Sequence, residues 1–158
     1  MVSHLLSEVS TVVTVERGQF GIADGDDLED ASWLSLRVKD HGFAVGSGGI
    51  KVASTIAMHD ADIAMESWDG DPPPAPAGFA SLGRQTFRSS AGFLVPWAFA
   101  HGPTDVELAL PGPGRYAIEV FRHGGGADAR AMQETSDPPV FEGLERYLVR
   151  LWPQDLGP

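Results

Sequence analysis

Two alternating hydrophobic runs near the C-terminal end, Leu108 to Arg122 and Glu145 to Pro153, limit the possible folds of this chain most strongly. In the first run, Tyr116, Ile118 and Val120 fall on one side of an extended backbone. The second run repeats the alternation, and β-branched and aromatic residues at a period of two indicate strands. The two runs are therefore expected to pair as antiparallel neighbours in an all-β domain.

Glycine and proline interrupt the rest of the chain. The 158 residues include 19 glycines and 12 prolines, and 42% are hydrophobic. This length suits one domain with one core, and frequent turn residues suit short strands better than long helices. We expect a single domain over residues 1–158, in which residues 1–8 form a loose N-terminal arm. The expected fold is a two-sheet antiparallel β-sandwich of about ten short strands, and a closed β-barrel is the alternative.

Local patterns give more specific expectations. Residues 9–16 and 19–23 are predicted to pair through a turn at Arg17-Gly18, and residues 43–45 and 50–53 through a glycine turn. The stretch 69–76, rich in proline, is predicted to be a stiff connector between the two sheets. A short helix is expected at 128–133. Further strands are predicted at 32–39, 62–68, 83–88, 92–99 and 105–110.

Charge and cysteine content exclude several classes of function. The chain has 22 acidic and 11 basic residues, a net charge of −11, and no cysteine. Such a surface repels nucleic acid and anionic membranes, whereas it suits a basic protein partner; solubility is the alternative explanation. The absence of cysteine excludes disulfides and thiol chemistry and favours the reducing cytoplasm. The N-terminal residues lack the pattern of a secretory signal, and no apolar run could span a membrane.

Metal-binding patterns are incomplete. Asp24 and Asp26 begin a calcium-loop spacing, but Leu28 stands where the third ligand belongs, so a solvated acidic loop is favoured. The nearest approach to another metal-binding set is the cluster His59, Asp60 and Asp62. We therefore predict neither a metal nor a cofactor.

Catalytic patterns are incomplete as well. His123 to Gly126 resembles an oxyanion motif, but the chain has no nucleophile elbow, and the glycine turn before Lys51 lacks phosphate-loop spacing. Glu66 and Glu119 could form a glycosidase pair, although carboxylates on the wet face of a sheet are ordinary and strand arginines are expected to pair with them. The chain is therefore predicted not to be an enzyme.

The four tryptophans could form a sugar-binding platform. Trp33 and Trp68 adjoin acidic loops and are expected to be partly exposed, whereas Trp97 and Trp152 lie in apolar runs and are expected in the core. Packing in the core or at its rim is the favoured interpretation.

Two stretches resemble known proteins. Residues 12–20, in which a hydrophobic strand leads into Gln19-Phe20, are similar to the opening of the competence protein J family, small bacterial nuclease inhibitors. Residues 110–116 followed by 145–153 look like a recurring ending of uncharacterised, chiefly actinobacterial, β-proteins. The resemblance implies a cytoplasmic all-β protein that binds and blocks a nuclease or toxin.

The functional hypothesis is a non-enzymatic acidic binding protein, an immunity or nuclease-inhibitor protein that blocks a basic toxin or nuclease. Its carboxylates would substitute for substrate phosphates. The alternative is a β-sandwich module that binds a carbohydrate or another small ligand. The predicted partner-binding residues are Asp24, Asp26, Asp27, Glu29, Asp30, Glu66, Trp68, Asp69 and Asp71.

Overall fold

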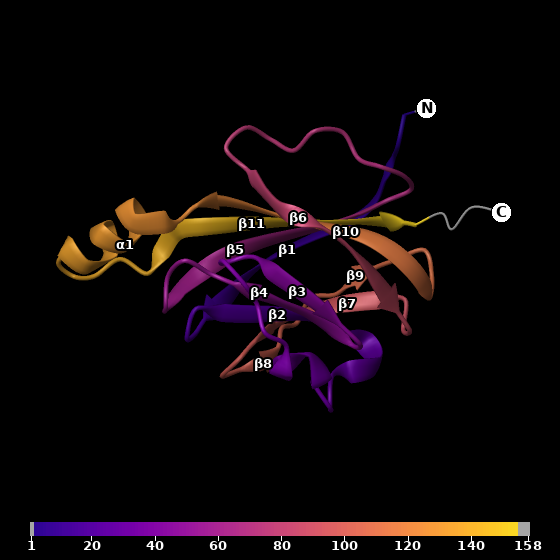
Figure 1. Ribbon diagram of the computed structural model, residues 1–158, viewed down its shortest axis with the longest axis horizontal. Coiled ribbons are helices and arrows are strands. Elements are labelled where there is room, and N and C mark those ends of the chain that lie inside the picture. Colours follow the sequence, from indigo (N-terminus) through magenta and orange to yellow (C-terminus); the bar gives the residue numbers. More distant parts are fainter. Residues whose placement is uncertain (1, 155–158) are drawn as a thin grey trace.

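The computed structural model describes residues 2–154 and shows two β-sheets packed face to face (Figure 1). Sheet A has the strand order β1 (Leu5–Val15), β5 (His59–Trp68), β11 (Glu142–Pro153), β10 (Gly114–Gly124), β6 (Ala80–Ser89). Sheet B has the order β3 (Phe43–Gly46), β4 (Gly49–Ala53), β2 (Gln19–Asp24), β7 (Phe93–Ala98), β8 (Gly102–Pro103), and β9 (Leu108–Ala109) also pairs with β7. Neither sheet closes on itself within residues 2–154, so the predicted sandwich is confirmed and the barrel alternative is wrong.

The two C-terminal runs form the centre of sheet A. β10 and β11 pair antiparallel from Tyr116 opposite Pro153 to Gly124 opposite Glu145, as predicted. β11 also pairs with β5, and this pair is parallel, an exception to the antiparallel arrangement expected throughout. Ile118 is fully buried, which places the predicted apolar side of β10 against sheet B.

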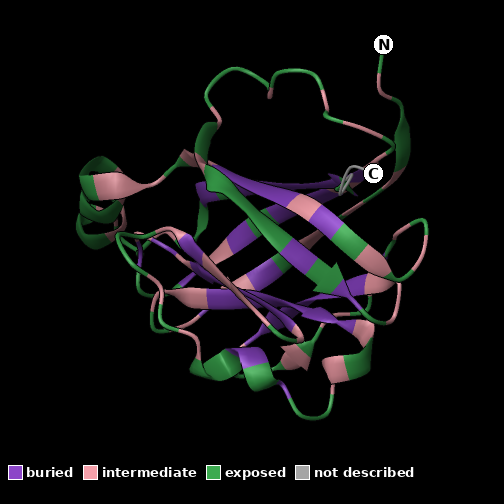
Figure 2. Ribbon diagram, turned by 45° about the vertical axis from the view of Figure 1, so that its right-hand side comes forward, coloured by how far each residue is buried: buried purple, intermediate pink, exposed green. Residues whose placement is uncertain are grey.

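One apolar core fills the space between the sheets. It takes inward-facing residues from both layers, including Val15, Phe20, Ile63, Phe87 and Val149. Figure 2 shows the buried positions on the strands, whereas the loops and the helix are mostly exposed. Each fully buried side chain of this size contributes about 1.5–3 kcal/mol, so this core is the main source of stability.

The first two strands do not form the hairpin that their alternation predicted. Arg17 and Gly18 do form a tight turn with positive φ angles of 54° and 70°, but beyond it a single bridge joins Glu16 to Gln19. β1 continues in sheet A and β2 in sheet B. Both strands turn their apolar side toward the same core, which is equally consistent with a hairpin and with a crossing between sheets.

The proline-containing stretch from Asp69 to Pro76 has no regular secondary structure, as predicted. It does not connect the two sheets, however, because it links β5 to β6 within sheet A and lies over the outer face of that sheet (Figure 1). We call residues 69–76 the strap.

The prediction of a strand at residues 32–39 is wrong. This stretch instead contains the short 3-10 helix η2 (Ser32–Ser35), and another 3-10 helix, η1 (Gly25–Asp27), precedes it. The buried indole of Trp33 packs on the outer face of sheet B, where Gly21 and Gly49 leave room for it. Trp33 forms a second apolar cluster with Ala23, Ala31 and Trp97, separate from the main core. The strand predicted at 105–110 is reduced to the two residues of β9.

Helix α1 (Gly126–Thr135) contains the helix predicted at 128–133. It projects from the end of the β10–β11 pair, and none of its residues is buried (Figure 1). Among residues 2–154, no helix has the length and apolar character needed to cross a membrane.

Candidate functional site

The acidic loop after β2 contains a buried anchor. Asp24 is only 1% exposed, and its carboxylate accepts hydrogen bonds from the Ser89 hydroxyl at 2.5 Å and the Ala91 N–H at 3.2 Å. Asp27 is half-buried and accepts hydrogen bonds from the Ser32 N–H and hydroxyl, both at 2.8 Å. These two predicted binding residues hold the loop in place, and Asp24 is not accessible to a partner.

The remaining predicted residues of this loop are exposed. Asp26, Glu29 and Asp30 lie in η1 and the turn that follows it, and none of them takes part in an ion pair within residues 2–154. We call these three carboxylates the η1-loop surface. A cation from another molecule would meet no internal competitor there.

Charged residues of opposite sign form a row across the outer face of sheet A. Strand register aligns Glu66, Arg150, Glu119 and Arg84 on four adjacent strands. Arg150 Nε lies 2.8 Å from Glu66 Oε1, and Arg84 Nε lies 3.0 Å from Glu119 Oε1. Arg150 therefore pairs with Glu66 across the sheet, as expected in general for the strand arginines. Glu66 and Glu119 each have an arginine partner, so they are not a free carboxylate pair for glycoside hydrolysis.

The strap completes this row from outside. Arg150 donates to the Pro73 carbonyl at 2.7 Å, and Arg84 lies 3.3 Å from Asp71. Asp69 accepts a hydrogen bond from the His4 backbone N–H at 2.6 Å, which lowers the pKa of the Asp69 carboxyl. The acidic residues predicted on this side are thus largely engaged within the chain.

The predicted binding residues do not form one surface. The η1 loop lies below sheet B and the strap above sheet A, on opposite sides of the sandwich (Figure 1). One compact partner site cannot include both groups.

The tryptophans form no exposed platform. Trp97 and Trp152 are buried as predicted, and Trp33, expected to be partly exposed, is fully buried. Trp68 is half-buried; its indole N–H donates to Glu66 at 2.9 Å, and the Arg150 guanidinium lies 5.5 Å from its ring. All four therefore pack in the core or at its rim.

A buried polar network surrounds Glu145 at the start of β11. Its Oε1 accepts from the Ser54 hydroxyl at 2.5 Å and the Tyr147 hydroxyl at 2.6 Å, and its Oε2 accepts from the N–H of Thr55 at 3.0 Å and from the Thr55 hydroxyl. His59 Nε2 lies 3.3 Å from Oε1. Burial by itself would raise the pKa of Glu145, but hydrogen bonds from His59, Ser54, Thr55 and Tyr147 outweigh it and lower the pKa to about 2. Burial, followed by the negative charge of Glu145, raises the pKa of Tyr147.

This network contains the residue types of a hydrolase triad without its geometry. Ser54 Oγ and Glu145 Oε1 both lie next to the same ring nitrogen of His59, whereas a triad uses opposite nitrogens of the imidazole. His59 Nδ1 has no hydrogen-bond partner within residues 2–154. The network joins the β4–β5 connection to the start of β11, which is a structural role.

The side chains of His59, Asp60 and Asp62, the nearest approach to a metal-binding set in the sequence, do not converge. His59 points into the interior, whereas Asp60 and Asp62 lie less buried, and Asp60 accepts a hydrogen bond from Thr14. No group of three potential metal-ligating side chains occurs in the described part of the chain.

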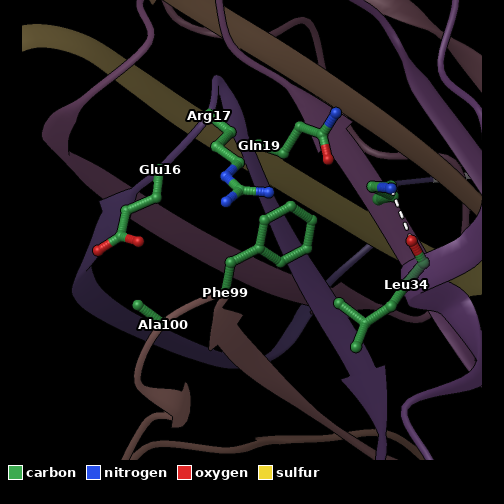
Figure 3. Close-up of a pocket in the computed structure, with 7 residues that line it drawn as sticks. Glu16, Arg17, Gln19, Leu34, Phe99 and Ala100 are labelled. Carbon is green, nitrogen blue, oxygen red and sulfur yellow. Dashed lines mark hydrogen bonds between the residues drawn. The ribbon is translucent and has the colours of Figure 1, made fainter.

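A cationic cavity opens on the outer side of sheet B. It has a volume of about 570 Å³ and is lined by Glu16, Arg17, Gln19, Leu34, Lys51, Phe99 and Ala100 (Figure 3). Lys51 is buried, and its ammonium donates to the Leu34 carbonyl at 2.7 Å and the Leu36 carbonyl at 3.0 Å. Burial lowers the pKa of Lys51.

Two solved structures resemble this fold along nearly its whole length. No family model and no curated protein sequence matches the chain. The fold resembles that of ComJ from Bacillus subtilis, an inhibitor of the DNA-degrading activity of NucA, with a TM-score of 0.60 and 12% identity over 98% of this chain and all of ComJ. It also resembles the product of crocagin biosynthetic gene J, with a TM-score of 0.55 and 14% identity over the same shares. The resemblance to the competence protein J family inferred from residues 12–20 is therefore confirmed at the level of the fold.

Sequence reasoning did not predict that Lys51 and Glu145 are buried. Lys51 stands between Ile50 and Val52, and Glu145 follows Leu144 at the start of a hydrophobic strand. A charged residue inside an apolar run is the signal that could have identified them, since such residues are rarely buried without partners.

Proposed function

We propose that the chain is a non-enzymatic binding protein that inhibits a basic partner enzyme, a DNA-degrading nuclease. The observation that carries this proposal is the fold shared with ComJ along nearly the whole chain. The net charge of −11 supports it, because a nuclease active site that attracts phosphates also attracts carboxylates.

The η1-loop surface is the contact region that we propose. Asp26, Glu29 and Asp30 are exposed and have no ion-pair partners within the described residues, whereas Glu66, Asp69 and Asp71 are already paired. A basic partner therefore gains more from approaching the η1 loop than from displacing arginines on sheet A. Asp24 and Asp27 support this surface from behind.

The test is inhibition of DNA hydrolysis by purified NucA and by nucleases captured from cells that produce this protein. The wild-type chain is expected to slow hydrolysis by a partner nuclease. The variant D26N/E29Q/D30N is expected to bind about tenfold more weakly or worse, because it removes three charges that face basic groups. Raising the salt concentration is expected to reduce the difference in affinity between the wild type and this variant, because salt screens the charges.

The matched control is D128N/E134Q/D137N, which neutralises three other exposed carboxylates that form no ion pair in the described structure. It is expected to inhibit like the wild type. If only this control lost inhibition, the interface would lie at α1 and not at the η1-loop surface. A wild-type chain that inhibits none of the nucleases would refute the inhibitor function itself.

A further inference from the structure

The ammonium of Lys51 has no countercharge within residues 2–154. Lys51 is 7% exposed, and no described carboxylate forms an ion pair with it. Two backbone carbonyls take two of its three N–H donors, and Nζ lies 5.3 Å from the centre of the Phe99 ring. A buried cation held only by carbonyl dipoles and an aromatic face remains attractive to an anion.

A second cation lines the same cavity. Arg17 is exposed, lies in the turn between β1 and β2, and takes part in no ion pair within residues 2–154. Figure 3 shows its guanidinium on the same side as the Phe99 ring, whereas the Glu16 carboxylate points away from that ring. Arg17 and Lys51 thus bring two positive charges to one cavity of a chain whose net charge is −11.

The remaining lining suits an apolar group. The faces of Phe99 and Leu34 border the cavity, and Gln19 adds one amide that can donate or accept. The volume of about 570 Å³ is in the range of small-molecule sites.

We propose that this cavity binds a small organic anion, an acid group carried on a flat apolar ring. Arg17 contacts the acid group through its planar fork, Lys51 supplies the second positive charge, and Phe99 and Leu34 contact the ring. This site is independent of the η1-loop surface, and it gives the chain a small-molecule ligand whether or not it inhibits a nuclease.

The experiment is titration of the full chain with three probes, benzoate, phenyl phosphate and neutral benzamide, followed by calorimetry and by amide NMR shifts. At least one of the two anions is expected to bind, to shift amides of β4 and the β1–β2 turn, and to bind about tenfold more tightly than benzamide. Benzoate and phenyl phosphate then distinguish a carboxylate site from a phosphate site.

Two variants test the residues. Arg17→Gln is expected to weaken the bound anion about tenfold, whereas Arg88→Gln, which removes an exposed arginine on sheet A, is expected to leave affinity unchanged. Lys51→Met is expected to weaken anion binding too. Because the Lys51→Met variant also loses hydrogen bonds to the η2 region, Arg17→Gln is the deciding variant. The proposal is overturned if neither anion binds, if benzamide binds as tightly, or if Arg17→Gln binds like the wild type.

Discussion

Glu145→Gln is expected to lower the free energy of unfolding by about 3 kcal/mol, because it breaks a buried charged network without changing its volume. The Glu145 carboxylate accepts from the hydroxyls of Ser54, Thr55 and Tyr147 and from a backbone N–H. A glutamine offers one acceptor oxygen and turns an NH₂ donor toward the remaining donors. For a chain of this size we expect the melting temperature to fall by about 6–12 °C.

Glu142→Gln is the matched control for this variant. Glu142 lies three positions earlier in β11 and is exposed, so its replacement is expected to change stability by no more than about 0.5 kcal/mol. Urea unfolding of both variants at pH 7 provides the comparison. Equal stability of the two variants would show that the network does not stabilise the fold.

The low pKa of Glu145 also predicts a pH dependence. Its folded-state pKa of about 2 lies below the ordinary value of 4.5, so the folded state favours the charged form. The stabilisation is fully present above about pH 4.5 and is lost as the pH falls toward 2, and the shift corresponds to about 3 kcal/mol. Unfolding at pH 7, 4 and 3 should therefore show a smaller loss of stability in Glu145→Gln than in the wild type. If the wild type and Glu145→Gln lost the same free energy of unfolding between pH 7 and pH 3, the low pKa of Glu145 would be contradicted.

Local elements of this fold could be predicted from sequence, because their causes are local. Alternating apolar residues and glycine turns predicted β10, β11 and the β3–β4 hairpin correctly, because these signals depend only on residues that are close in sequence. The path between sheets could not be predicted in this way. The same alternation on β1 and β2 is satisfied by a hairpin and by a crossover, and only the packing of both sheets on one core distinguishes them.

The candidate sites, like the fold, have local features that the sequence shows and long-range contacts that it does not. The acidic loop was visible as a run of carboxylates, but its separation into buried Asp24 and exposed Asp26 depends on where Ser89 lies, and Ser89 is 65 positions later. The cavity at Lys51 joins residues from the β1–β2 turn, β2, η2, β4 and the turn after β7. No spacing in the sequence records such a convergence. Trp33 was misplaced for a related reason, since its burial depends on two distant glycines.

Trp33→Ala is expected to destabilise the fold by about 3–5 kcal/mol, the usual cost of removing a buried aromatic side chain. The indole contacts Trp97 edge-on with ring centroids 5.8 Å apart and stacks on Phe99 at 5.9 Å. Its loss leaves the outer face of sheet B bare over Gly21 and removes the anchor of η2. Trp68→Ala, at a half-buried rim position, is the control and is expected to cost clearly less.

Gly21→Ala tests the same packing from the other side and gives a double-mutant cycle. A Cβ at Gly21 would lie 2.1 Å from the Trp33 ring, so the single substitution should displace the indole and cost several kcal/mol, about as much as Trp33→Ala. In the Trp33→Ala background the ring is absent and the methyl group has room, so Gly21→Ala is expected to cost less than about 1 kcal/mol. Chemical denaturation of the four proteins measures this coupling. If the two costs simply added, the Trp33 ring would not be the reason that a glycine is needed at position 21. The explanation that Trp33 packing shapes residues 32–39, predicted as a strand, would then be wrong.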